Sequence, residues 1–309
     1  MIIDVHCHLW DEKVPSRLWF QAMVRYGVAV SGSSEEKVRQ KILDGQFDVS
    51  GDLLIHDMDE AGIDKGAIHV MDLGLFAGVG IDDAVSLERQ HQIFFEAVER
   101  YPNRLFAFAG VDPRRPDAVG LIKRAVREWK MKGVKLWTPS GFYPNDKQAY
   151  RLYAACEELG LPVWVHSGPE IAPFYMGNTQ PKFIDEVASD FPNLRIVIAH
   201  SGDHWWREAA IIANAKPNAF LDIASWQVSF LHSSPRFYRE FRDLVNIAGP
   251  SKVMFGSDWP ATRLVQSINL ANWVETIKQL SGEGVMGVRF SESEISAILG
   301  GNARRLLGL

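Results

Sequence analysis

Short apolar or β-branched runs recur along the chain, and amphipathic stretches lie between many of them. Eight runs have the length and residue types of buried strands. They are Ile2–His6, Gly66–Asp72, Leu105–Ala109, Gly133–Trp137, Pro162–His166, Arg195–His200, Ala219–Asp222 and Lys252–Phe255. Helical spacing is found in Asp83–Tyr101, Asp117–Lys130, Asp146–Leu159, Lys182–Phe191 and His204–Ala213. Strand and helix in repeated alternation predict an α/β protein built as a closed (β/α)8 TIM barrel, with an open doubly wound sheet as the alternative.

The connection after the first strand is too long for a simple loop. From Leu9 to about Leu53 it carries several aromatic and basic residues and then a polar stretch. Long ordered insertions are usually lids or interfaces. We therefore expect one barrel domain over residues 1–309, with residues 9–53 as a lid-like insertion over the barrel mouth.

Composition narrows the classes of function. Of 309 residues 47% are hydrophobic and 23% are charged, a balance typical of globular proteins. The net charge of −5, with acidic and basic residues interspersed, argues against nucleic acid or an anionic membrane as partner. No signal-peptide pattern and no membrane-span pattern is evident, so we expect a cytoplasmic protein that acts on a small molecule. A homodimer is compatible with the sequence.

Candidate chemistry begins on the first strand, in His6-Cys7-His8. Side chains alternate along a strand, so the two histidines share one face and could bind one ion. Two hydrogen-bonded core histidines are the alternative, and Cys7 is expected on the opposite face.

Polar residues also stand at the ends of later strands. Lys135, His166 and His200 lie at the ends of the fourth, fifth and sixth runs, and Asp258 follows the eighth. The carboxyl ends of barrel strands converge on one mouth, where active sites are found. We therefore expect these side chains to form one site together with the histidine pair.

The order of these residues resembles the signature of the amidohydrolase superfamily. The stretches FPNLRIVIAHSG and VMFGSDWP are similar to its amidohydrolase-2 branch, which includes aminocarboxymuconate-semialdehyde decarboxylase, resorcylate decarboxylases and hydrolases of ring-derived acids. The resemblance runs from the first strand to the eighth, and only the insertion between Leu9 and Leu53 is poorly matched.

The resemblance implies one divalent ion held by His6, His8, His166 and Asp258. Three neutral imidazoles and a carboxylate suit Zn²⁺, which is the first candidate, with Mn²⁺, Fe²⁺ and Co²⁺ as alternatives. It also implies that His200 is the acid/base residue and that Asp258 can accept a proton. In two-metal members the lysine corresponding to Lys135 is carboxylated and bridges the ions. Here Lys135 could instead bind a substrate carboxylate or form a structural ion pair.

Aromatic residues follow many of the predicted strands, so a flat or ring-like ligand is expected to stack there. The candidate substrate-binding residues are Lys135, Trp137, Tyr143, His204 and Trp226. Further candidates for binding a carboxylate are Arg17, Arg25, Arg114 and Arg263. The predicted activity is metal-dependent hydrolysis of a small, carboxylated cyclic or aromatic compound. Non-oxidative decarboxylation of an aromatic or muconate-type acid is the alternative.

Overall fold

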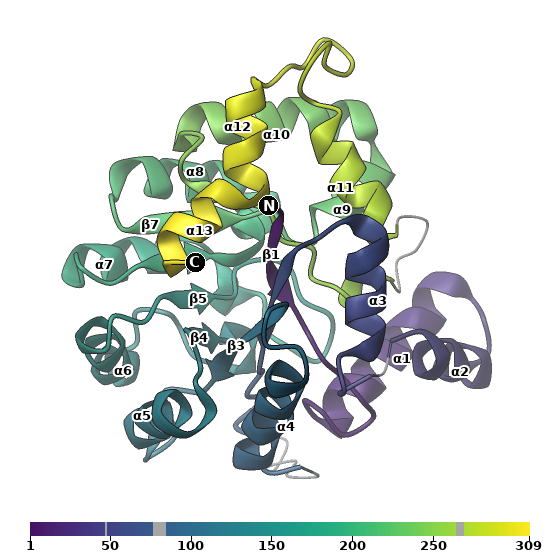
Figure 1. Ribbon diagram of the computed structural model, residues 1–309. Coiled ribbons are helices and arrows are strands. Elements are labelled where there is room, and N and C mark those ends of the chain that lie inside the picture. Colours follow the sequence, from purple (N-terminus) through teal and green to yellow (C-terminus); the bar gives the residue numbers. More distant parts are fainter. Residues whose placement is uncertain (47, 77–84, 264–268) are drawn as a thin grey trace.

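The computed structural model describes residues 1–46, 48–76, 85–263 and 269–309 (Figure 1). Eight parallel strands lie side by side in chain order. They are β1 (Ile3–Cys7), β2 (Lys65–His69), β3 (Leu105–Gly110), β4 (Val134–Leu136), β5 (Val163–Val165), β6 (Ile196–Ile198), β7 (Ala219–Asp222) and β8 (Val253–Met254). Backbone hydrogen bonds then join the two edges of the sheet, from Val5 N to Phe255 O (3.1 Å) and from His8 N to Trp259 O (2.7 Å). The predicted (β/α)8 barrel is confirmed, and the open-sheet alternative is wrong.

Helices surround the strands (Figure 1). They are α1 (Arg17–Ser31), α2 (Glu35–Gln46), α3 (Asp52–Ala61), α4 (Leu87–Arg100), α5 (Ala118–Trp129), α6 (Lys147–Glu158), α7 (Lys182–Asp190), α8 (Trp206–Ala215), α9 (Trp226–His232), α10 (Ser234–Ala248), α11 (Leu270–Lys278), α12 (Glu292–Ser296) and α13 (Asn302–Leu307). The five predicted helices correspond to α4 through α8, with ends shifted by a few residues. Residues 83 and 84 of the first predicted helix lie outside the described part of the chain.

A β-bulge on β1 sets the direction of the two histidines. Ile3 and Val5 pack in the barrel interior with residues of the other strands, whereas Cys7 belongs to the layer between strands and helices. The pairing of β1 with β2 shifts register between Asp4 and Cys7. An extra residue at a bulge changes the phase of alternation. His6 and His8 therefore both face the barrel axis, with their ring centroids 5.2 Å apart.

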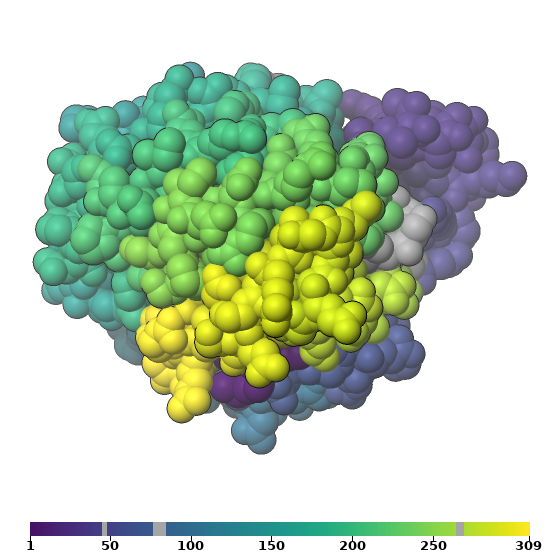
Figure 2. Space-filling view, turned by 90° about the horizontal axis from the view of Figure 1, so that it is seen from above, coloured from purple at the N-terminus to yellow at the C-terminus, as the bar shows by residue number. Residues whose placement is uncertain are grey.

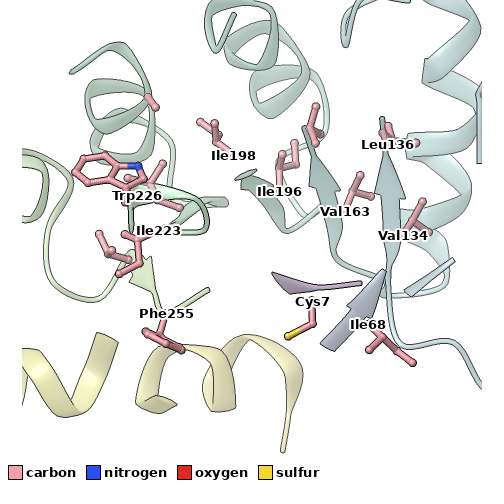
Figure 3. Packing of buried hydrophobic residues seen from close by; sticks show 14 of the residues in the cluster. Cys7, Ile68, Val134, Leu136, Val163, Ile196, Ile198, Ile223, Trp226 and Phe255 are labelled. Carbon is pink, nitrogen blue, oxygen red and sulfur yellow. The ribbon is translucent and has the colours of Figure 1, made fainter. Parts of the chain in front are cut away.

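The outer faces of the strands form the larger core. Figure 3 shows Cys7 in this layer, with apolar side chains of neighbouring strands such as Ile68, Val163 and Ile198. These side chains are essentially excluded from water. At the amino-terminal end of the barrel, α13 covers the interior with Ala303 and Leu306. The carboxyl ends of the parallel strands lie at the opposite end of the barrel, where a site can form.

The insertion contains two helices of its own. In Figure 1, α1 and α2 stand outside the ring of helices, and Figure 2 shows the same segment projecting from one side of the molecule. The two helices pack against each other, while α3 belongs to the first strand–helix unit. The lid-like role of residues 9–53 stays a prediction. Among the described helices, none combines the length and apolarity that crossing a bilayer requires.

Candidate metal centre and active site

A cavity of about 150 Å³ opens at the carboxyl ends of the strands. An engineered apolar cavity of about 150 Å³ in another protein holds one benzene molecule, so this space suits a single ring. Its described lining residues are His6, His8, Trp10, Trp19, Met71, Lys135, Trp137, His166, Gly168, Pro169, Glu170, His200, Asp203, Ser225, Asp258 and Ala261. All of the predicted metal and acid/base residues are therefore in one place.

The first-strand histidines converge on the carboxylate of Asp258. Asp258 Oδ1 lies 3.2 Å from His8 Nε2 and 3.7 Å from His6 Nε2, and its Oδ2 accepts a hydrogen bond from Ser225 Oγ (2.6 Å). Burial alone would raise the pKa of Asp258, but the neighbouring imidazoles of His8 and His200 and the hydrogen bond from Ser225 lower it to about 2. Asp258 is thus an anion at neutral pH.

The contact at Nδ1 of His8 shows which nitrogen of its ring holds the lone pair. Nδ1 lies 3.2 Å from the carbonyl oxygen of His69, which can only accept, so Nδ1 carries the hydrogen. Burial lowers the pKa of His8, so its ring is neutral and Nε2 has a lone pair. That lone pair faces the Asp258 carboxylate, and two acceptors this close repel each other unless a cation lies between them. The arrangement fits a bound metal ion.

His166 and His200 form a second pair of neighbouring imidazoles. His200 Nδ1 lies 3.2 Å from the carbonyl oxygen of Ala224, which can only accept, so Nδ1 carries a hydrogen. Its Nε2 lies 3.3 Å from His166 Nδ1, and the two nitrogens share a hydrogen bond. The remaining nitrogen, His166 Nε2, is buried and has no hydrogen-bond partner among the described residues. A buried ring nitrogen without a hydrogen-bond partner suits a metal ligand.

The donor atoms of the four predicted ligands are not all equally close to one another. His6, His8 and Asp258 bring their donor atoms within 4.8 Å of one another. His166 is not part of that group, and its Nε2 lies 3.4 Å from Oε1 of Glu170. The structure thus assembles three of the four predicted ligand positions and places the fourth on the wall of the same cavity.

Backbone strain is concentrated at this site. His200, Ser225 and Asp258 have φ values of 57°, 66° and 59°, in the left-handed region that side chains rarely adopt. Holding a residue in such a conformation costs free energy, and residues of this kind cluster at functional sites. Here the strained backbone aims the side chains of His200 and Asp258 into the cavity.

The predicted substrate contacts divide into two groups. Lys135 and Trp137 line the cavity, and Trp137 packs edge-on against Trp19, with their ring centroids 5.8 Å apart. Lys135 is fully buried and its Nζ lies 2.9 Å from His6 Nε2, while burial lowers its pKa to about 8.

The other three candidates lie elsewhere. Tyr143 is 41% exposed and packs on Phe183. The exposed ring of His204 pairs with Asp203 at 2.7 Å. Trp226 is in the core, where its Nε1 donates to the carbonyl oxygen of His200 (2.8 Å). None of the three is among the described lining residues of the cavity.

Sequence reasoning missed two buried carboxyl groups. Glu170 lines the cavity just beyond β5, and Asp222 is fully buried at the end of β7. An acidic residue at or just past the end of a strand was the available signal, the same signal that singled out His166 and His200. Asp222 had been assigned only to its strand.

Glu170 gives the first testable prediction. Burial raises its pKa from 4.5 to about 8, so the native state keeps a proton that the unfolded chain releases above pH 4.5. The free energy of unfolding of the metal-free protein therefore falls as the pH rises from about 4.5 to about 8, by on the order of 5 kcal/mol. Glu170→Gln should remove this dependence and raise the melting temperature at pH 8.

The measurement is thermal unfolding of chelator-treated protein at pH 5 and pH 8. Glu158→Gln, an exchange at an exposed position of α6, is the matched control. A Glu170→Gln protein with an unchanged melting temperature at pH 8 would show that Glu170 is ionised at little cost.

The chain matches a known protein family over nearly its whole length. A sequence model of the amidohydrolase-2 family, described as amidohydrolase, matches residues 3–309. No match was found among curated protein sequences.

Three solved structures show the same fold. A 5-carboxyvanillate decarboxylase from Novosphingobium aromaticivorans, complexed with manganese, has a TM-score of 0.71 and 19% identity, over 100% of this chain and 96% of that one. A dihydroxybenzoic acid decarboxylase from Polaromonas, with bound manganese, has a TM-score of 0.67 and 18% identity, over 100% and 97%. A probable 2-pyrone-4,6-dicarboxylic acid hydrolase from Acinetobacter baumannii has a TM-score of 0.63 and 17% identity, over 100% and 99%. The family match spans nearly the whole chain, and the protein is therefore a member of the amidohydrolase-2 family and an enzyme of that type.

Proposed function

We propose that this protein is a metal-dependent hydrolase of a small cyclic or aromatic compound. The observation that carries the proposal is the convergence of His6 Nε2 and His8 Nε2 on the anionic Asp258. We assign one divalent ion to these residues, with His166 as the fourth ligand and Zn²⁺ or Mn²⁺ as the first candidates. An ion bound there supplies Lewis acidity, which lowers the pKa of water and polarises a carbonyl oxygen.

The chain's own residues supply proton transfer. His200 lines the cavity, and its Nδ1 is bound to the Ala224 carbonyl, so Nε2, 3.3 Å from His166 Nδ1, is the nitrogen that can exchange a proton. An imidazole nitrogen can take a proton from water during attack and return it to the leaving group. Asp258, beside His8, is the second group able to accept a proton.

Aromatic side chains shape the substrate site. Trp10, Trp19 and Trp137 form a wall of the cavity, with Trp10 and Trp19 at 5.6 Å between ring centroids. Rings of this kind bind flat ligands by offset or edge contacts. The wall and the cavity volume together favour a single-ring substrate such as a lactone.

The side chains that line the cavity favour hydrolysis over decarboxylation. The described lining holds three carboxyl side chains, from Glu170, Asp203 and Asp258, of which Glu170 keeps its proton up to about pH 8, and it holds no arginine. Arg114 is instead bound to Asp112 and Arg263 to Asp57. An anionic substrate would meet few partners in such a cavity.

Decarboxylation of an aromatic or muconate-type acid stays the second candidate because of Lys135. Its buried Nζ lies next to His6, where it could bind a carboxylate beside the ligand cluster. Two of the similar structures are of decarboxylases. A cytoplasmic location and a homodimer also stay predictions.

A substrate panel tests the proposal. Metal-loaded protein is incubated with lactones and with aromatic and muconate-type acids, and ring opening and CO₂ release are scored separately. We expect ring opening without CO₂, and loss of the activity in a His200→Asn control. Release of CO₂ without ring opening would replace hydrolysis by the decarboxylase alternative.

A further inference from the structure

The buried carboxylate of Asp222 has four hydrogen-bonding partners and lies outside the proposed set of ligand and acid/base residues. It lies at the end of β7 and is fully buried. One oxygen, Oδ2, lies 3.0 Å from His6 Nδ1 and accepts from Trp164 Nε1 at 3.0 Å. The other, Oδ1, accepts from the backbone amides of His200 (2.8 Å) and Ala224 (3.0 Å).

These contacts show that Asp222 does not itself bind an ion. Donor atoms of His6, His200 and Asp222 lie within 4.8 Å of one another, which is close enough for a metal site. A carboxylate has about four lone-pair sites, and here four N–H groups occupy them. Asp222 therefore acts through its neighbours.

The contact with His6 selects one form of its ring. A carboxylate oxygen only accepts, so His6 Nδ1 must carry the hydrogen. Its Nε2 then holds a lone pair, which faces Lys135 Nζ at 2.9 Å and Asp258 Oδ1 at 3.7 Å. The contacts of both ring nitrogens therefore favour the tautomer with its hydrogen on Nδ1, whose Nε2 can bind a metal.

The same carboxylate also anchors the loop that carries His200. His200, Ser201 and Asp203 have φ values of 57°, 47° and 47°, a strained stretch directly after β6. Asp222 binds the His200 amide, and its own carbonyl oxygen accepts from Ser201 Oγ (2.6 Å). One residue of β7 therefore connects a histidine of β1 with the histidine that follows β6.

We propose that Asp222 is the positioning residue of this site: it fixes His6 with Nε2 free for the ion and anchors the backbone at His200. The inference rests on the proposed metal-dependent function. Partners of this kind raise the basicity of a ligating histidine and fix its ring, and their loss typically lowers metal affinity 10- to 100-fold.

The first test reads the His6 ring directly and needs no metal. Nitrogen-15 NMR of histidine-labelled, chelator-treated protein reports which ring nitrogen carries the hydrogen. We expect hydrogen on Nδ1 in the wild type. In Asp222→Asn the backbone amides of His200 and Ala224 should hold the side-chain oxygen of the asparagine in the place of Oδ1. The side-chain NH₂ group then faces His6, and the hydrogen of the His6 ring should move from Nδ1 to Nε2. Hydrogen on Nε2 in the wild type would overturn the inference, whether or not the variant folds.

The second test measures Mn²⁺ affinity by competition with a chelator. Asp222→Asn should bind Mn²⁺ about 10- to 100-fold more weakly than the wild type. Trp164→Phe is the matched control, because it removes another donor to the same oxygen but leaves the His6 contact. We expect its affinity to stay within about threefold of the wild type, although the loss of core volume lowers its melting temperature.

The outcomes separate the inference from the proposed function. Equal Mn²⁺ affinity in the wild type and in folded Asp222→Asn would overturn the positioning role while leaving the metal site in place. An equal loss in Trp164→Phe would reduce the effect to general destabilisation and overturn it as well. A wild-type protein that binds neither Mn²⁺ nor Zn²⁺ would overturn the proposed function and, with it, the role of Asp222 toward the ion.

Discussion

Asp258→Asn is expected to strip the protein of its metal and of its activity without unfolding it. Asp258 is the anionic partner of both first-strand histidines, so the exchange removes the charged ligand and leaves two imidazoles facing a neutral amide. The amide NH₂ can donate to the lone pair of His8, which relieves the repulsion between two acceptors. The metal-free variant should therefore melt at the same temperature as the metal-free wild type or higher, while its metal content falls from about one ion per chain to a small fraction.

Metal analysis by mass spectrometry and thermal unfolding check this expectation. Asp203→Asn is the matched control, since Asp203 also lines the cavity but pairs with His204 outside the ligand cluster. Full metal occupancy in Asp258→Asn would remove Asp258 from the ligand set. Unfolding of the variant would indicate a structural role instead.

His200→Asn should keep the ion and lose turnover. Removing a general acid–base typically lowers the rate by 10²- to 10⁴-fold, and we expect kcat to fall within that range. Asparagine is the suitable replacement because the backbone of His200 is left-handed, a conformation that asparagine tolerates. The carbonyl of His200, which accepts from Trp226, is retained in the variant.

Three measurements on that variant distinguish the roles of His200. Metal content and melting temperature near those of the wild type, with a low kcat, identify an acid/base residue. A parallel loss of metal and rate would make His200 a ligand. A near-normal kcat in the folded fraction would remove it from the mechanism.

The fold and the place of the site could be predicted from the sequence because both follow from repeated local signals. Strand runs recur eight times, and polar residues at their ends must converge when parallel strands close into a barrel. His6, His8, His166, His200 and Asp258 accordingly line one cavity. The bulge on β1 could not be predicted, because alternation alone places His6 on the face opposite Val5.

The substrate contacts were harder to predict for a physical reason. A residue just past a strand end can turn into the cavity, into the core or into solvent, depending on the loop that carries it. Trp137 turns into the cavity, Trp226 into the core and Tyr143 toward solvent, although all three follow strands. Glu170 and Asp222 depend on tertiary contacts in the same way, since only the folded barrel buries their carboxyl groups beside histidines.

The central claim is that one ion at His6, His8, His166 and Asp258 makes the protein a hydrolase. The most direct test is to strip the protein with a chelator and titrate Zn²⁺ or Mn²⁺ back while following ring opening of the best substrate of the panel. We expect no activity in the stripped protein and a linear recovery that ends at one equivalent per chain. Full activity of the stripped protein would contradict it, and recovery that ends only at two equivalents would replace the single ion by a pair bridged at Lys135.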